Sequence, residues 1–253
     1  MIVIKSEHEI ELMRQAGKVC AEIFEGLNTI IKPGISTKDI DHYVESTCKK
    51  HNMIPAEKGY CGYPASACTS VNEEVVHGIP NAKRILRDGD IVSVDIVVEN
   101  QGLMADACRT YGVGQISQEH QHLIDTAKEA FFAGLKECKA GNRLLQVSKS
   151  VQNKVEGEGF NVIRDYTGHG IGRDMHEDPP VFHYVPDSRY ERVPNPRLQK
   201  GMALCVEPMI CEGDWEVDVL LDDWTAVTCD GGWAAHYENT IIITDGEPEV
   251  ITL

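Results

Sequence analysis

An internal repeat constrains the fold of this 253-residue chain more than any other feature. After Gly34 and again after Gly141, apolar residues follow at helical spacing, with an offset of 107 positions between the two copies. A second pattern, Leu-x-x-Gly-x-x-x-x-Val followed by an acidic residue, occurs at 86–95 and recurs at 198–207. Each half therefore contains two predicted helices and an acid-bearing strand. Two copies are too few for a solenoid, so we predict one α+β domain over 1–253, with pseudo-symmetric halves of about 1–115 and 116–253.

Capping signals place the helices of the first half. Ser6 with Glu9 forms a capping box, and apolar residues then recur at helical spacing as far as Leu27. Ser36 with Asp39 starts the next helix. In the second half, the apolar spacing predicts helices over 117–140 and 144–156. Residues 55–80, rich in Gly, Pro, Ser and aromatic residues, predict an irregular region that contains His77.

Residues 86–114 predict a β-hairpin with two unusual carboxylates in its apolar arms. A two-residue loop at Asn100-Gln101 would place Asp95 directly opposite Asp106, on one face and with Cβ atoms about 5 Å apart. Like charges so close repel each other, and each is costly to desolvate. Two interpretations remain open at this point: two independent edge-strand carboxylates that face water, or two ligands of a shared cation.

The repeat extends this argument to the second half. If Asp95 has a hairpin partner, then Glu207, its counterpart, is expected to have one too, and Glu238 at the head of the strand 241–244 is the best candidate. Four converging carboxylates would not be tenable without cations, which favours a metal site. The Gly-rich segment 166–180 adds nitrogen donors in His169 and His176. The alternative is a flexible loop with incidental histidines.

Composition excludes several classes of function. A formal net charge of −16 argues against tight binding to nucleic-acid backbones or anionic membranes. No apolar run reaches membrane-spanning length, and the apolar stretch at the N-terminus is too short for a signal peptide. Nine cysteines without a C-x-x-C pair suggest reduced thiols in a cytoplasmic protein.

Carboxylates with one or two imidazoles form a hard, oxygen-rich donor set. It suits a pair of Mn, Fe(II), Co or Zn ions better than a single structural zinc, which favours Cys and His. Two such ions with bridging carboxylates are typical of hydrolytic sites that activate a water molecule. The residues alone therefore point to a dinuclear metal hydrolase.

At these residues the chain resembles a known family. The order of the acids and His169, the segment G-H-G-I-G at 168–172, V-E-P-M at 206–209 and Y-E-N-T at 237–240 are similar to the methionine aminopeptidases of the M24 metallopeptidases. The resemblance covers nearly the whole chain. The short spacing from His176 to Glu207 matches the short, bacterial-type type I enzymes and leaves no room for the helical insertion of type II. The implied architecture is the pita-bread fold, a central antiparallel sheet with helices outside.

The resemblance also implies a role for each site residue. The ligands of the first metal would be Asp106, His169, Glu207 and Glu238, and those of the second Asp95, Asp106 and Glu238. Glu207 would shuttle a proton from a metal-bridging hydroxide, while His77 and His176 would act on the substrate near the scissile amide. The pocket for the methionine side chain would be formed by Tyr60, Tyr63, Cys68, Met175 and Trp224.

The implied reaction is removal of N-terminal methionine from nascent proteins and peptides when the second residue is small. We expect a monomer that contacts ribosomes at most transiently and binds neither nucleic acid nor membranes directly. Two alternatives are a proline-specific aminopeptidase or dipeptidase of the same fold and a non-catalytic peptide-binding module. All five ligands and both additional histidines are present, which favours an active enzyme.

Four positions depart from the common pattern of the family. Val97 stands where a hydroxyl residue is usual and Ala105 where glycine is usual, both beside the second metal. Glu57 and Cys61 replace a small thiol-type residue and a histidine on the pocket loop. We expect Glu57 to lie near the mouth of the site and to alter preference beyond the first substrate residue.

Overall fold

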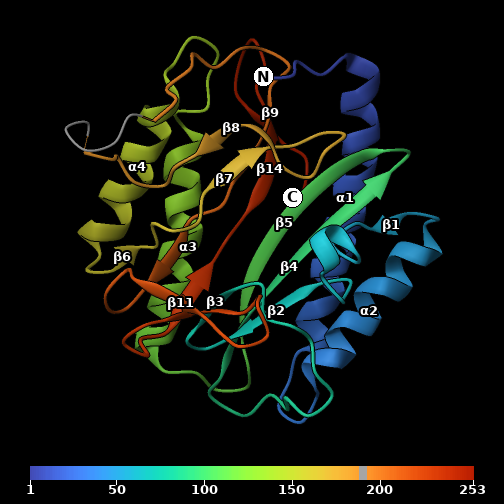
Figure 1. The fold of residues 1–253 in the computed structure, drawn as a ribbon, viewed down its shortest axis with the longest axis vertical. Helices are drawn as coiled ribbons and strands as arrows, with labels where there is room; N and C mark the ends of the chain where they lie inside the picture. The colour runs from blue at the N-terminus through green and yellow to red at the C-terminus, as the bar shows by residue number, and fades with distance from the viewer. Residues whose placement is uncertain (188–192) are drawn as a thin grey trace.

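The computed structural model describes residues 1–187 and 193–253. Long helices lie on two sides of the molecule, and two long paired strands cross between them (Figure 1). The helices of the described residues are α1 (Glu7–Ile30), α2 (Thr37–Lys50), α3 (Gln118–Leu135) and α4 (Leu144–Gly157). The crossing strands are β4 (Ile91–Asn100) and β5 (Leu103–Gly112). No helix in these ranges has the length and apolar character needed to cross a membrane.

The predicted capping boxes set the starts of α1 and α2. The Ser6 hydroxyl accepts the N–H of Glu9 at 3.3 Å, and the Glu9 carboxylate accepts the N–H of Ser6 at 2.9 Å. Ser36 and Asp39 exchange the same two bonds at the start of α2. The third helix was predicted too long: α3 ends at Leu135, because tight i to i+3 hydrogen bonds turn the chain after that residue.

The predicted hairpin forms, but its loop lies one position later in the chain than predicted. The predicted pairing of residues between the two strands is therefore wrong. The two central loop residues are Gln101 and Gly102, with φ of 53° and 81°. A two-residue hairpin turn of this kind requires positive φ at both positions, and glycine supplies it most readily at the second. Asp95 consequently lies opposite Cys108, and Asp106 lies opposite Val97. The two aspartates remain on one face of the hairpin as diagonal neighbours.

Equivalent backbone hydrogen bonds support the internal repeat. The N–H of Gly34 donates to the Leu86 carbonyl at 2.9 Å, and the N–H of Gly141 donates to the Leu198 carbonyl, also at 2.9 Å. Both glycines have positive φ, 96° and 95°, where a side chain would be strained. Isolated bridges follow the same offsets of 107 and 112: Ser36 with Ile85, and Arg143 with Arg197. The two helix pairs are therefore joined to their strands in the same way.

Each helix pair covers its own set of strands. The pair α1 and α2 buries its apolar faces against β4 and β5, with residues such as Met13, Ile23 and Val94 in the core. The pair α3 and α4 packs around Phe131 against β9 (Ala203–Val206) and β14 (Asn239–Ile242). In Figure 1 these two layers of helices lie on opposite sides of the strands. The ligand-bearing strands thus lie in the interior between two cores.

Shorter strands complete the molecule around this centre. Residues 55–80, predicted as irregular, contain the strands β2 (Cys68–Val71) and β3 (Glu74–Val76), and β2 pairs with β4. The other strands that bear on the site are β7 (Gly168–Gly170), β8 (Glu177–Val181), β10 (Met209–Cys211) and β13 (Ala234–His236). The remaining elements are β1 (Ile54–Pro55), η1 (Tyr60–Gly62), β6 (Asn161–Val162), β11 (Val217–Val219), β12 (Ala226–Thr228) and β15 (Glu249–Val250).

Candidate metal centre

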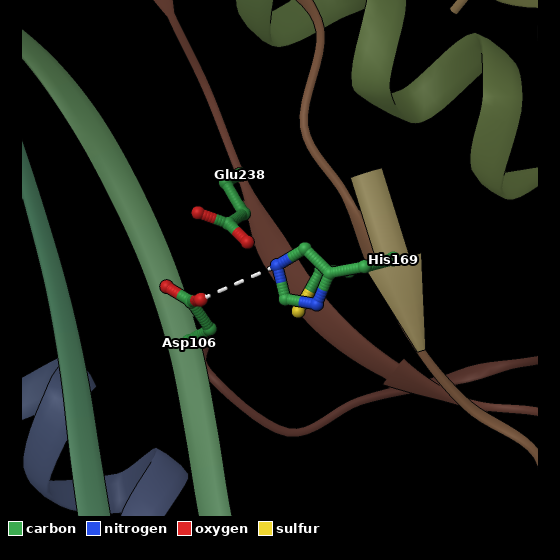
Figure 2. A group of neighbouring side chains, drawn as sticks. Asp106, His169 and Glu238 are labelled. Atoms are coloured by element: carbon green, nitrogen blue, oxygen red, sulfur yellow. Dashed lines mark ion pairs between the residues drawn. The ribbon is translucent and has the colours of Figure 1, made fainter. Parts of the chain in front are cut away.

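Strands from both halves bring the five predicted ligands together. Asp95 is in β4 and Asp106 in β5, while His169 is the central residue of β7. Glu207 directly follows β9, and Glu238 directly precedes β14. Because Val206 pairs with Asn239, these two glutamates lie across from each other one step beyond the end of the ladder. Figure 2 shows the side chains of Asp106, His169 and Glu238 pointing toward one another from three different segments of the chain.

The His169 ring is oriented for coordination. Its Nδ1 lies 2.9 Å from the carbonyl oxygen of Gly170, so the ring donates Nδ1–H there and presents Nε2 to the carboxylates. Nε2 is 3.6 Å from Oδ2 of Asp106 and 3.4 Å from Oε1 of Glu207. Burial lowers the pKa of His169 to about 3, which keeps its Nε2 lone pair available near neutral pH.

The carboxylates themselves lack compensating partners. Each has one buried oxygen without a hydrogen bond: Oδ1 of Asp95 and of Asp106, and Oε1 of Glu207 and of Glu238. Among the described residues, their ion-pair neighbours are histidines only. Such a set would be costly to keep ionised in the absence of cations. The residues therefore fit a divalent metal centre, in which orphaned oxygens become ligands.

The pKa values of the four carboxyls also show that their ionised forms are unfavourable in the absence of a cation. Burial raises the pKa of Asp95 to about 7. The pKa of Asp106 rises well above its ordinary value because of burial and, next, the charge of Glu238. Burial also raises the pKa of Glu207 and of Glu238, followed by the charge of a neighbouring carboxylate in each case. A bound cation would reverse this effect by favouring the ionised form.

One cavity of about 230 Å³ gathers all the candidate site residues, whereas Ala105, expected beside the second metal, lies outside it in the core that contains α1. Its walls include the five predicted ligands, both additional histidines and the five predicted pocket residues: Asp95, Asp106, His169, Glu207, Glu238, His77, His176, Tyr60, Tyr63, Cys68, Met175 and Trp224. Glu57, Cys61 and Val97 also line it. The cavity thus joins an acidic, histidine-containing end to an aromatic and sulfur-rich end.

The two additional histidines hold different positions in this cavity. His77 has φ of 59°, a conformation rare for a residue with a side chain, and its ring lies edge-on to Trp224 and Tyr166. Burial lowers the pKa of His77 to about 4, so its ring is neutral near pH 7. The Nδ1 atom of His176 lies 2.7 Å from the Tyr60 hydroxyl. Both rings can therefore present a neutral N–H to a ligand.

Glu57 is not at the mouth of the cavity, and that prediction was wrong. The residue is only 6% exposed, because β1 and the turn after it hold the loop against β4. Its Oε2 accepts the Cys68 thiol at 3.4 Å, and burial, with the charge of Asp95 next, raises its pKa. Of the two departures on the pocket loop, Glu57 and Cys61, only Cys61 is exposed. Glu57 therefore lies beside the aromatic end of the cavity.

Two buried histidines were missed at the sequence level. His183 accepts the backbone N–H of Glu207 on its Nε2 at 3.0 Å and so holds that residue in place. His236 lies next to Asp95 and Glu207 and is 1% exposed. The sequence did contain a signal for His236, since it precedes Glu238 by two positions. In an extended chain, such a spacing places both side chains on one face.

Comparisons with known proteins identify the family of this chain. The model of metallopeptidase family M24 matches residues 11–245. The chain is 50% identical over 253 residues to a methionine aminopeptidase of Clostridium acetobutylicum, covering 100% of this chain and 99% of the relative. It is 46% identical over 252 residues to methionine aminopeptidase 1 of Bacillus subtilis, with the same coverage of both chains.

Solved structures extend the likeness to three dimensions. A methionine aminopeptidase from Thermotoga maritima superposes with a TM-score of 0.95 at 45% identity, over 100% of this chain and 99% of that one. An Xaa-Pro dipeptidase from Bacillus anthracis gives a TM-score of 0.75 at 23% identity, over 98% of this chain and 61% of that one, and shares the fold alone. The predicted α+β pita-bread fold is confirmed.

Proposed function

Because this chain belongs to metallopeptidase family M24 and matches methionine aminopeptidases over its full length, it removes N-terminal methionine from polypeptides, and we propose that the buried carboxylate cluster is its catalytic centre. Membership of the family implies the use of divalent metal. The observation that carries the proposal is a set of four carboxylates, three of them buried and Asp95 half-buried, each with an orphaned oxygen, at the end of an aromatic cavity.

In this proposal two ions share the cluster. The first would be held by Asp106, His169, Glu207 and Glu238, and the second by Asp95, Asp106 and Glu238. The carboxylate and imidazole donors suit Mn, Fe(II), Co or Zn. When bound, such a pair would supply Lewis acidity for the scissile carbonyl and would lower the pKa of the attacking water.

The side chains of this protein would provide the remaining chemistry. Glu207 would accept the proton of the attacking water and pass it to the leaving amine, acting as general base and then as general acid. His176 and His77 would donate hydrogen bonds to the carbonyl oxygen and to the amide of the scissile bond. Their neutral rings suit this role, because each can donate an N–H without carrying a charge into the cavity.

The aromatic end of the cavity would bind the first residue of the substrate. Tyr60, Tyr63, Cys68, Met175 and Trp224 offer soft, apolar contacts that suit a thioether side chain. We propose that only peptides with a small second residue fit next to these walls. Nascent polypeptides are the implied substrates, and the enzyme would act as a cytoplasmic monomer, as one catalytic domain over 1–253, with at most transient ribosome contact and none with nucleic acid or membranes.

The test is release of free methionine from Met-Ala-Ser by purified protein. The sample is stripped of metal and then reloaded separately with Mn, Fe(II), Co or Zn. We expect metal-dependent release that is abolished by Asp106→Asn and strongly reduced by His77→Ala. Asp125→Asn, on the exposed face of α3, is the matched control and keeps wild-type activity.

The outcomes separate the alternatives. Hydrolysis of X-Pro peptides but not of Met-Ala-Ser would identify a proline-specific peptidase. Failure to bind any of these ions would favour a peptide-binding module without catalysis. Equal activity of wild type and Asp106→Asn would show that the carboxylate cluster is not the catalytic centre.

A further inference from the structure

His236 is a buried histidine held rigidly beside the carboxylate cluster. It ends β13 and precedes Glu238 by two residues. Thr110 fixes its backbone on both sides, because the His236 N–H donates to Oγ1 of Thr110 at 2.9 Å and this hydroxyl donates to the His236 carbonyl at 2.8 Å. The ring is 1% exposed, so water does not satisfy it from outside.

One nitrogen of this ring has no hydrogen-bond partner. Nε2 of His236 is a buried atom without a partner, as is one oxygen of each of the four carboxylates. A buried polar atom left unsatisfied is costly, and several such atoms that face one centre indicate a missing ligand. His183, which is equally buried, differs in this respect, because its Nε2 accepts the N–H of Glu207.

The distances around His236 fit co-ligands better than hydrogen bonds. Nε2 is 3.8 Å from Oε2 of Glu207, and Nδ1 is 4.0 Å from Oδ2 of Asp95. Both separations are too long for a hydrogen bond. Two donor atoms that each lie about 2.1 Å from one ion are about 3 to 4 Å apart. Ligand atoms of Glu207, His236 and Glu238 all lie within 4.8 Å of one another.

We propose that His236 is a further nitrogen ligand of the metal centre, binding through Nε2 to the ion that Glu207 and Glu238 hold. This ion would then have two imidazole ligands, from His169 and His236. A second imidazole shifts the preference of an oxygen-rich site from Mn toward Co, Fe(II) and Zn. The inference rests on the proposed metal centre but not on the activity of the enzyme.

The test counts coordinated imidazoles directly. The metal-free full-length protein receives one equivalent of Co(II), and proton NMR records the strongly shifted, solvent-exchangeable ring N–H signals of coordinated histidines. We expect two such signals in the wild type, one in His236→Gln, and two in His122→Gln, a control at an exposed histidine of α3. Calorimetry should show Co(II) affinity reduced roughly 10- to 100-fold in His236→Gln, with a smaller loss for Mn(II).

Each outcome decides the inference. One shifted signal in a wild type that binds Co(II) and cleaves Met-Ala-Ser would overturn the role of His236 alone and leave the proposed function intact. Equal losses of affinity for Co(II) and Mn(II), with an unchanged signal count, would assign His236 to positioning of the carboxylates instead. A wild type that binds no Co(II) would overturn the metal centre itself. If His236→Gln does not fold, the signal count of the wild type and of His236→Asn gives the answer.

Discussion

Cys108 and Glu238 exchange two backbone hydrogen bonds, from the Glu238 N–H to the Cys108 carbonyl at 3.0 Å and from the Cys108 N–H to the Glu238 carbonyl at 3.4 Å. This pair joins the strand that carries Asp106 to the segment that leads into β14 (Figure 1). Cys108 is also the residue opposite Asp95. The junction of the two halves and the candidate metal centre are therefore at the same place.

Arg109 is expected to stabilise this junction. Its guanidinium donates to the carbonyls of Cys108 and Glu238 and stacks over the rings of Phe24 and Tyr237. Arg109→Met should lower the free energy of unfolding by roughly 2 to 4 kcal/mol, because it removes charge-assisted hydrogen bonds and cation–π contacts. Chemical denaturation of the metal-free protein measures this loss.

The control for this prediction is Arg173→Met. Arg173 is exposed and forms an ion pair with Glu9 at 3.1 Å, and such surface pairs contribute at most about 1 kcal/mol. Similar losses for the two variants would contradict the stabilising role of Arg109.

Asp95→Asn should change the stability of the protein in opposite directions with and without metal. Burial raises the pKa of Asp95 to about 7, whereas an unfolded aspartate titrates near 4. Between about pH 4 and pH 7, the folded metal-free protein keeps a proton that the unfolded chain has lost, so its free energy of unfolding falls as pH rises. The metal-free variant should therefore be more stable than wild type by roughly 1 to 4 kcal/mol at pH 8 and equal to it near pH 4.

With saturating metal the order is expected to reverse, because the wild type gains binding energy that the variant lacks. Thermal unfolding at both pH values, with metal and with a chelator, measures these differences. Asp125→Asn should follow the wild type throughout. A metal-free Asp95→Asn protein that is less stable at pH 8 would refute the repulsion that we describe among the carboxylates.

Tyr60→Phe should slow turnover by disturbing His176. The 2.7 Å contact between the Tyr60 hydroxyl and Nδ1 of His176 fixes the orientation of the ring, and with the hydroxyl as donor it leaves the proton on Nε2. We expect kcat to fall about 10-fold with a smaller change in KM, since the lost interaction acts on the transition state. Tyr111→Phe also loses a hydroxyl contact, to the Phe24 carbonyl, but should leave both constants unchanged. A change in KM alone would show that the Tyr60 hydroxyl acts only on substrate binding and does not orient His176.

Glu57 is expected to affect selectivity for the first residue of the substrate. Among the described residues its buried carboxyl accepts a hydrogen bond from the weakly donating thiol of Cys68, and it lines the same cavity as Tyr63 and Trp224. A side chain with a terminal hydroxyl can therefore hydrogen-bond there, whereas a hydrocarbon cannot. Peptides that begin with 5-hydroxynorvaline or norleucine, which differ only by hydroxyl and methyl at the end, measure the effect.

In Glu57→Leu, the ratio of kcat/KM for the hydroxyl peptide to that for the norleucine peptide should fall about 10-fold or more. In Glu57→Gln, which keeps a hydrogen-bonding group, the ratio should stay close to the wild-type value. A ratio that is the same in all three proteins would mean that Glu57 does not contact the first side chain.

Local signals in the sequence predicted much of this structure. Ser6 and Ser36 are followed by acids at the capping positions, and the helices start there because these bonds are made within one turn. The repeat identified Glu207 as the counterpart of Asp95, and the partner expected for Glu207 was sought at the head of the strand 241–244, where Glu238 lies across from it. Register was harder to predict. The glycine at position 102 favours the observed loop, Gln101-Gly102. The pattern of apolar residues in the two arms, however, is almost equally compatible with the predicted loop one position earlier.

Tertiary packing accounts for the other differences. The burial of Glu57 depends on β1 pairing with β4, and the contact of His236 with Asp95 depends on a segment more than 100 residues away. Neither feature follows from local periodicity. The periodicity of apolar residues indicates which face of a helix or strand is buried, but not which other element packs against that face. His236 was nevertheless recoverable from its spacing to Glu238. The thiol, carboxyl and imidazole groups that meet at this centre depend on the arrangement of both halves.

The equivalent hydrogen bonds of Gly34 with Leu86 and Gly141 with Leu198 show that each helix pair is attached to its own strands by local contacts. The metal ligands, in contrast, come from both: Asp95 and Asp106 from one side, and His169, Glu207 and Glu238 from the other. Neither set alone assembles the centre. Retention of the ions in the proposed centre would therefore require that both sets of strands are correctly docked, so loss of metal would report an incorrectly assembled chain.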